Sequence, residues 1–255
     1  MADYRNIQAR TSAGVRVDAG IDQGLRSYML KVYNLMSIGL AVTGLAALAT
    51  VYLATTNDPS LAAAQLPNGK MLTSLGVAIY GSPLRWVVML APLAAVFFLS
   101  FRVEKMSVSA AQTTFWVYAA LVGVSLSSIF LIYTTGSIVQ TLFITAASFG
   151  ALSLYGYTTK RDLSGMGSFL FMGLIGIILA SLVNIFLASS ALQFAISVIG
   201  VLVFAGLTAF DTQQIKEMYY EGDTYGRKAI MGALRLYLDF INMFVFLLQF
   251  LGNRN

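Results

Sequence analysis

Seven long apolar segments constrain the fold of this chain more than any other feature of its sequence. They run at 32–54, 84–101, 111–133, 138–157, 168–187, 193–215 and 232–251. Each approaches the ~20 residues that a helix needs to cross ~30 Å of hydrocarbon. Because a helix satisfies its own backbone hydrogen bonds in lipid, the pattern predicts an all-α polytopic membrane protein with seven transmembrane helices.

The composition supports this class and excludes several kinds of chemistry. Hydrophobic residues make up 58% of the chain and charged residues 11%, against roughly 25% charged residues in a soluble domain. The sequence has neither Cys nor His, which excludes disulfides, thiolate nucleophiles, histidine-based triads and histidine metal ligands. The net charge of +5 is not clustered as in a nucleic-acid-binding patch, so we expect a lipid bilayer and no nucleic acid as partner.

The basic residues predict the orientation of the spans. With the N-terminus in the cytoplasm, 13 of the 16 Lys and Arg residues fall on the inner side. The remaining three, on the outer side, are Lys70, Arg85 and Arg254. Since cytoplasmic loops carry an excess of basic residues, we expect the N-terminus inside and the C-terminus outside. The chain then divides into a cytoplasmic tail (1–31), a seven-helix transmembrane domain (32–252) and an outer tail (253–255).

The longest outer connection covers 55–83. Its stretch LTSLGVAIYGSPL is apolar, but it is shorter than a membrane span. We expect a short amphipathic or partly inserted piece there.

Two acidic residues lie inside predicted spans: Asp211, in AFDTQQIK, and Asp239, in LYLDFINMFVFLLQFLG. A carboxylate costs about 2.5–3.5 kcal/mol at the centre of a membrane helix, and less near an end. Asp211 precedes Lys216 by five residues and Asp239 follows Arg235 by four, so both lie about 6–8 Å beyond the basic boundary. Because the last two spans are consecutive and antiparallel, the two carboxyl groups can meet.

One face of the last span gathers polar residues. At about 100° per residue, Arg235, Asn242 and Gln249 lie roughly 40–80° from Asp239, so this arc is expected to face protein or water. Two carboxyl groups in contact cannot both ionise cheaply, and they titrate as a unit. The alternative is that Asp239 only anchors its helix by pairing with Arg235, and that Asp211 is capped by Thr208, by Gln214 or by the inner loop.

The same two stretches, AFDTQQIK and LYLDFINMFVFLLQFLG, resemble the Bax inhibitor-1 family, the transmembrane Bax-inhibitor-motif proteins, and the second matches bacterial members closely. The resemblance covers about 25–252. It implies seven helices with the last one in the centre of the other six, in the bacterial cytoplasmic (inner) membrane. It also implies a pH-sensitive calcium leak with Ca²⁺ as the permeant ion, and we expect no tightly bound cofactor.

The resemblance also implies roles for single residues. Asp211 and Asp239 match the family's hydrogen-bonded aspartate pair near the cytoplasmic mouth, where they sense pH. Arg102 matches a latch arginine at the end of the second span, although it is alternatively an ordinary positive-inside residue. The supporting polar residues are Arg235, Asn242, Thr208 and Gln249. Two carboxylates with Asn242 and backbone carbonyls would form a sparse, transient Ca²⁺ site, because hard cations prefer oxygen ligands.

The chain departs from the family in two places. The second span, with VVMLAPLAAVFF, lacks the acidic residue that some members carry there. Arg235 stands where we expect an uncharged residue, and it is expected to shift the pH response.

Other functions are compatible with two aspartates on adjacent spans. An intramembrane aspartyl protease is the least favoured, because its GxGD and PAL motifs are absent, and a rhomboid-type protease would need a His base. A proton-coupled cation exchanger and a regulatory protein that binds partner helices remain as alternatives. We expect no enzymatic activity.

Overall fold

The structure, a computed structural model, describes residues 3–220 and 226–254. The long helices are α1 (Asp3–Ala54), α3 (Leu84–Arg102), α4 (Val108–Leu126), α6 (Thr135–Thr158), α7 (Ser164–Leu187), α8 (Ser190–Tyr220) and α9 (Arg227–Leu251). A short helix, α5 (Ile129–Ile132), follows α4 within the same candidate span, Val108–Ile132. Within the described ranges seven helices are long and apolar enough to cross a membrane, which confirms the predicted class and the number of spans.

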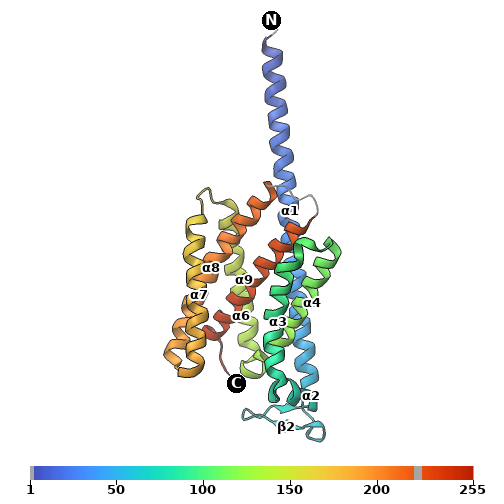
Figure 1. The fold of residues 1–255 in the computed structure, drawn as a ribbon, viewed down its shortest axis with the longest axis vertical. Helices are drawn as coiled ribbons and strands as arrows, with labels where there is room; N and C mark the ends of the chain where they lie inside the picture. The colour runs from blue at the N-terminus through green and yellow to red at the C-terminus, as the bar shows by residue number, and fades with distance from the viewer. Residues whose placement is uncertain (1–2, 221–225, 255) are drawn as a thin grey trace.

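The helices form an upright bundle with two distinct ends (Figure 1). One end carries residues 55–83 and the C-terminus, and we call it the sheet end. The N-terminal part of α1 projects from the opposite end. The first helix is continuous from Asp3, so no break separates the expected tail (1–31) from the first span. Residues 1–2 and 255 of the two expected tails lie outside the described residues.

A small sheet closes the sheet end. Strands β1 (Thr55–Thr56), β2 (Ala64–Gln65) and β3 (Met71–Leu72) pair antiparallel in the order β1-β3-β2. The short helix α2 (Ser74–Gly76) and a π-turn (Val77–Gly81) follow. A Cβ at Gly76 would lie 2.0 Å from the Ala54 carbonyl oxygen, so only glycine lets this segment pack on the end of α1. The expected short piece therefore corresponds to 74–81, while the sheet before it was not predicted.

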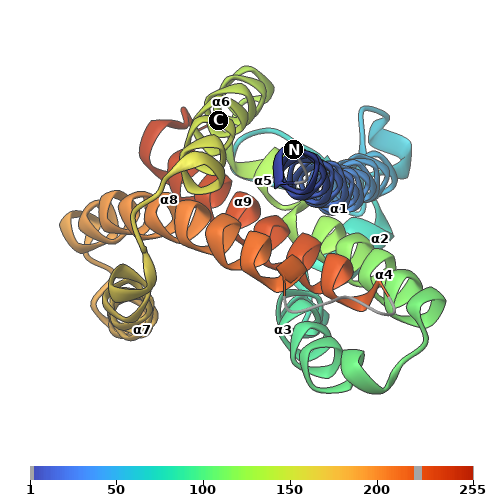
Figure 2. The same ribbon diagram turned by 90° about the horizontal axis from the view of Figure 1, so that it is seen from above.

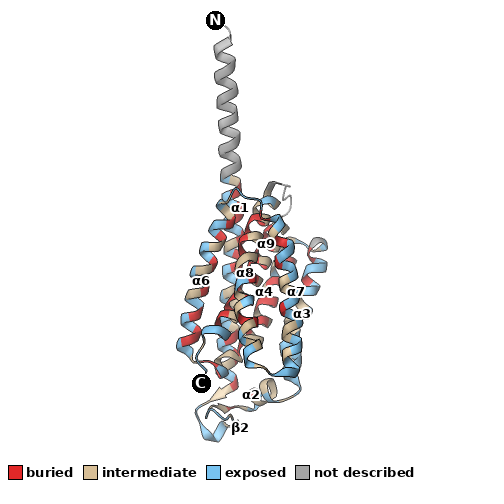
Figure 3. Cartoon of the chain, turned by 90° about the vertical axis from the view of Figure 1, so that its left-hand side faces the viewer, coloured by how far each residue is buried: buried red, intermediate tan, exposed pale blue. Residues whose placement is uncertain are grey.

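The last helix occupies the centre of the bundle, as the resemblance implied. Helix α9 packs against α1, α4, α6 and α8 (Figure 2). In its most apolar 18-residue stretch 61% of the residues are buried, against 6–39% for the other six spans. Figure 3 shows the same distribution, with buried residues concentrated inside the bundle and exposed ones on the outward faces.

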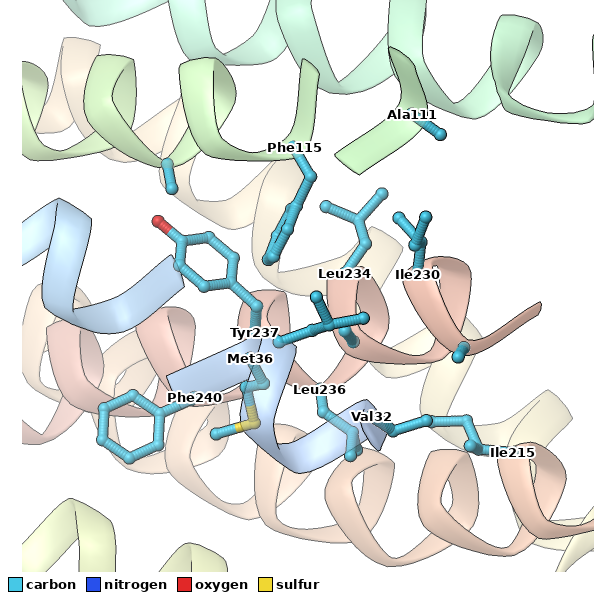
Figure 4. Packing of buried hydrophobic residues seen from close by; sticks show 14 of the residues in the cluster. Val32, Met36, Ala111, Phe115, Ile215, Ile230, Leu234, Leu236, Tyr237 and Phe240 are labelled. Atoms are coloured by element: carbon cyan, nitrogen blue, oxygen red, sulfur yellow. The ribbon is translucent and has the colours of Figure 1, made fainter. Parts of the chain in front are cut away.

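Aromatic packing fixes α9 against α1 and α4. Tyr237 is fully buried, and Figure 4 shows its ring beside that of Phe115. It meets Phe115 and Tyr118 edge-on, with ring centroids 5.6 and 5.7 Å apart. A Cβ at Gly39 would lie 2.7 Å from Phe115, so a glycine lets α1 approach these rings. The Tyr237 hydroxyl is 2.6 Å from Thr43 Oγ1. Since a buried Tyr hydroxyl needs a partner, this hydrogen bond makes the central position tolerable in lipid.

Candidate functional site

The structure brings Asp211 and Asp239 together between α8 and α9. These helices are joined by a short connection and pack along each other. The two carboxyl groups lie within hydrogen-bonding reach of each other. The side chain of Asp211 is 17% exposed, whereas Asp239 is only 4% exposed. Because an ionised carboxylate can only accept, a hydrogen bond between two carboxyl groups requires a proton on one of them.

One cation lies beside this aspartate pair. The Arg235 Nη1 atom is 4.0 Å from Asp211 Oδ1, and the Arg235 side chain is 42% exposed. In the part of the chain that the structure describes, Arg235 forms its ion pair with Asp211 and not with Asp239. Asp239 Oδ2 is buried and has no hydrogen-bond partner among the described residues. The Arg235 charge nevertheless acts on Asp239 as well, so the anchoring of Asp239 by Arg235, the alternative considered above, stays a prediction.

The aspartate pair lies on the wall of a cleft of about 790 Å³ that α3, α7, α8 and α9 enclose. Its charged and amide groups are Asp211, Arg235, Asp239 and Asn242. Apart from Gly167 and Ser181, the remaining lining is apolar: Leu93, Phe171, Leu174, Ile177, Ile178, Leu182, Ile185, Phe204, Leu207, Phe210, Leu238 and Phe246. Polar groups are thus gathered at one place in an otherwise apolar space.

Asn242 is the one supporting amide that lines this cleft. Its Nδ2 atom donates to the Leu238 carbonyl at 2.8 Å, which leaves the amide oxygen as the atom that could face a cation. Gln249 lies elsewhere, near the sheet end, where its Oε1 accepts from Gln193 at 2.9 Å and from Ser197 at 3.2 Å. Both residues lie on the same arc of α9, but they are seven residues apart along it, or about 10 Å.

Two further predicted residues are outside the cleft. Thr208 is fully buried in α8, and its hydroxyl donates to the Phe204 carbonyl at 2.8 Å. Arg102 is exposed at the end of α3, and no ion pair joins it to another described residue. The cation at the aspartate pair is therefore Arg235, while Arg102 ends the helix that forms one wall of the cleft.

The described residues contain no group of three or more His, Cys, Asp or Glu side chains that could hold a metal ion. A cation at the pair would have only two carboxyl groups, the Asn242 oxygen and backbone carbonyls as ligands. Ca²⁺ takes six to eight oxygen ligands in proteins. The arrangement therefore suits brief occupancy better than tight binding.

A second polar network was not predicted from the sequence. The Tyr33 hydroxyl is 2.6 Å from Ser153 Oγ, which in turn is 2.9 Å from Thr212 Oγ1. These residues join α1, α6 and α8, and Thr212 directly follows Asp211 in the sequence. The signal was present as single Ser, Thr and Tyr residues in apolar spans, but such residues are also common in membrane helix contacts without a functional role.

Comparison with known proteins places the chain in a family. The family model described as inhibitor of apoptosis-promoting Bax1 matches residues 25–255. An uncharacterised protein of Rickettsia prowazekii is 49% identical over 259 residues, covering 100% of this chain and 99% of the relative. The inner membrane protein YbhL of Escherichia coli is 47% identical over 236 residues, covering 91% and 93%. The resemblance found in the sequence is thus confirmed: the chain is a seven-helix membrane protein that belongs to the family of inhibitors of apoptosis-promoting Bax1.

Proposed function

We propose that this protein is a pH-sensitive calcium leak channel whose gate is the Asp211–Asp239 pair. The observation that carries the proposal is the contact of two carboxyl groups, one of them buried, in a cleft between membrane helices. Family membership supports the same reading. The similarity to YbhL, an inner membrane protein by name, supports a place in the bacterial inner membrane.

The proton is the switch in this proposal. With one proton shared, the pair is held together by its hydrogen bond. When that proton leaves, two negative charges face each other in a poorly solvated place, where repulsion is strong. Arg235 at 4.0 Å offsets part of this repulsion, but it is half-exposed and therefore screened. Loss of the proton then separates α8 from α9 or draws a cation between them.

Calcium is the permeant ion in this proposal, not a resident cofactor. The ionised pair offers oxygen ligands of the type that hard cations prefer. Among the described residues no third acidic side chain is grouped with the pair, which keeps binding weak. Weak binding suits conduction, because an ion has to leave the site as well as enter it.

Arg102 is proposed as the latch of the cleft wall. It ends α3, the span with the smallest buried share, 6%. A helix with so few buried residues can shift with little loss of packing, so a single charge at its end can bias its position. Arg102 would hold the wall closed through contacts with the ionised pair or the neighbouring loop.

Calcium flux into liposomes that contain only the purified protein tests the proposal. Wild-type flux is expected to change between about pH 6 and 8, and Asp211→Asn or Asp239→Asn is expected to remove most of that change. Asp162→Asn, at an exposed loop acid, is the matched control and is expected to keep the wild-type profile. Absence of calcium flux from correctly folded wild-type protein would reject the leak. Obligatory proton counterflow would reject it in favour of the exchanger.

A further inference from the structure

A second pocket, of about 670 Å³, lies at the sheet end, away from the aspartate pair. Its walls come from the loop at 66–68, the π-turn, the first turns of α3, the α4–α5 junction and the C-terminal segment. The candidate membrane span of α3 begins at Leu84. The pocket therefore lies where a membrane span ends, at the depth of lipid headgroups, whichever side of the membrane the sheet end faces.

Two arginines line this pocket without a carboxylate. Arg85 and Arg254 both contribute to its lining, and no acidic residue does. In the described ranges neither arginine forms an ion pair. The Arg85 guanidinium lies 5.2 Å from the Trp86 ring centroid, and that of Arg254 lies 6.0 Å from the Tyr133 ring centroid. Aromatic contacts of this kind orient a guanidinium but do not neutralise it.

The sheet end as a whole also has more basic than acidic side chains. Its basic side chains are Lys70, Arg85 and Arg254, and its one acidic side chain is Asp58. Hydrogen bonds from Ser60, at 2.7 and 2.8 Å, hold the pKa of the exposed Asp58 carboxyl below its ordinary value. The Asp58 carboxylate thus accepts hydrogen bonds within its own turn and does not line the arginine pocket. Two of the three basic side chains converge on one pocket and leave an excess positive charge there.

The rest of the pocket is mostly apolar, with Asn68, Ser125 and Ser128 as uncharged polar residues, and it includes exposed side chains of α3. Met89 and Ile132 line it and are 50% and 46% exposed, and Trp86 is 51% exposed. Tyr80 is fixed by a 2.7 Å hydrogen bond to Ser127, and burial raises the pKa of its hydroxyl, so it stays neutral. Arginine pairs well with phosphate because its planar donors match phosphate oxygens. A ligand that fits needs an anionic head and an apolar body.

We propose that this pocket binds the phosphodiester headgroup of an anionic membrane lipid, with Arg85 and Arg254 on the phosphate and an acyl chain along the exposed face of α3. The ligand chemistry follows from charge complementarity and from the depth of the pocket. The proposal is independent of ion conduction, because none of its residues lies in the cleft of the aspartate pair.

Native mass spectrometry of the purified full-length protein tests this site, with titration of phosphatidylglycerol and, separately, phosphatidylcholine. Phosphatidylglycerol is expected to bind the wild type at least about tenfold more tightly than Arg85→Gln/Arg254→Gln, since a basic residue near an anionic lipid surface contributes about 1 kcal/mol. Phosphatidylcholine is expected to bind both weakly and alike. The charge-matched control Lys160→Gln/Arg161→Gln, at the opposite end, is expected to keep wild-type binding, and Arg85→Lys/Arg254→Lys is expected to retain part of it.

Inorganic phosphate separates a lipid site from a site for free phosphate. At concentrations equal to those of the lipid it is expected neither to bind nor to displace phosphatidylglycerol. Displacement would overturn the assignment to a lipid, and unchanged phosphatidylglycerol binding in the double Gln variant would overturn the site itself. The single variants Arg85→Gln and Arg254→Gln, each expected to lose part of the affinity, decide the question if the double variant does not fold.

Discussion

Helices α3 and α9 both cross the membrane, yet they differ in surroundings and in composition. In the most apolar stretch of α3 only 6% of the residues are buried, with a mean hydropathy of 2.0. In α9 61% are buried, with a mean hydropathy of 1.6. The peripheral α7 repeats the α3 pattern, with 17% buried and a mean hydropathy of 2.5. The two least buried spans, α3 and α7, are thus more apolar than the most buried one, α9, the reverse of the usual pattern in water-soluble bundles. The spans between these extremes do not follow the same order, since the span Val108–Ile132 is 39% buried with a mean hydropathy of 2.1 and α6 is 33% buried with 1.5.

The reason lies in the solvent. A helix surrounded by lipid has no partner for a polar side chain, so the charged residues of α3 lie only at its two ends, Arg85 and Arg102. A helix surrounded by other helices can satisfy polar groups internally. In α9 this allows Tyr237 to hydrogen-bond with Thr43, and Asp239 to lie within hydrogen-bonding reach of Asp211. Central position and ionisable residues therefore occur together because each makes the other possible.

The largest expected effect concerns the direction in which α3 crosses the membrane. The chain has no natural Cys, so single cysteines replacing Lys70, Lys105 or Lys160 give an all-or-none readout. With the sheet end outside, an impermeant thiol reagent added to intact cells is expected to label position 70 and not positions 105 and 160. Labelling of position 160 but not 70 would invert the topology and move the aspartate pair toward the outer face.

The stability of the bundle is expected to depend on α9 far more than on α3. Tyr237→Ala is expected to lower the free energy of unfolding by about 3–5 kcal/mol, because it leaves a cavity against Phe115 and Tyr118. Phe101→Ala, at a side chain that is 78% exposed, is expected to cost about 0.5 kcal/mol or less. Unfolding in mixed detergent micelles measures both. Equal losses would show that α9 is not the packing centre.

The charge that ends α3 is expected to act on the leak rather than on stability. Arg102→Ala is expected to raise basal calcium flux roughly fivefold, which corresponds to a latch of about 1 kcal/mol. Flux into liposomes and unfolding in detergent are measured on the same preparation. Unchanged flux in folded protein would reduce Arg102 to a positive-inside residue.

The charge within α9 is expected to have a smaller effect, on the pH response. A cation beside a carboxylate favours the ionised form, so Arg235→Gln is expected to move the midpoint of pH-dependent flux upward by about half a pH unit. The exposed Arg161 provides the control, since Arg161→Gln is expected to leave the midpoint in place. A downward shift in Arg235→Gln would mean that Arg235 does not act on the ionised pair.

The sequence predicted the helical class and the seven spans well, but not all of their limits. The described helices α8 and α9 start or end several residues beyond the apolar segments, at Tyr220 and Arg227. Helical hydrogen bonding continues into polar residues such as Lys216 and Lys228, which hydropathy does not include. The sheet at 55–72 was missed because its strands have two residues each, too few for an alternating pattern.

The sequence predicted which site residues lie at the same depth in the membrane. It did not predict which way their side chains face around the helix or how far apart they lie along it. Asp211 and Asp239 were paired by counting residues from the basic boundary of two consecutive helices. Gln249 was grouped with them by its angle around α9, but it lies near the sheet end, on Gln193 and Ser197. Thr208 faces a backbone carbonyl of its own helix. Arg235 pairs with Asp211 on the neighbouring helix α8. A projection of α9 alone shows the angles of its own residues but not which side chains of another helix they contact.

The most direct test of the central claim is the pH profile of calcium flux in Asp211→Asn, Asp239→Asn and the double variant, each measured in liposomes with folded protein. If the two carboxyl groups share one proton, each single substitution removes most of the pH dependence and the double substitution adds little, because coupled residues act as one unit. If the two residues act independently, each single variant retains a substantial part of the wild-type profile and only the double variant is flat, and the account of a proton-sharing gate is contradicted.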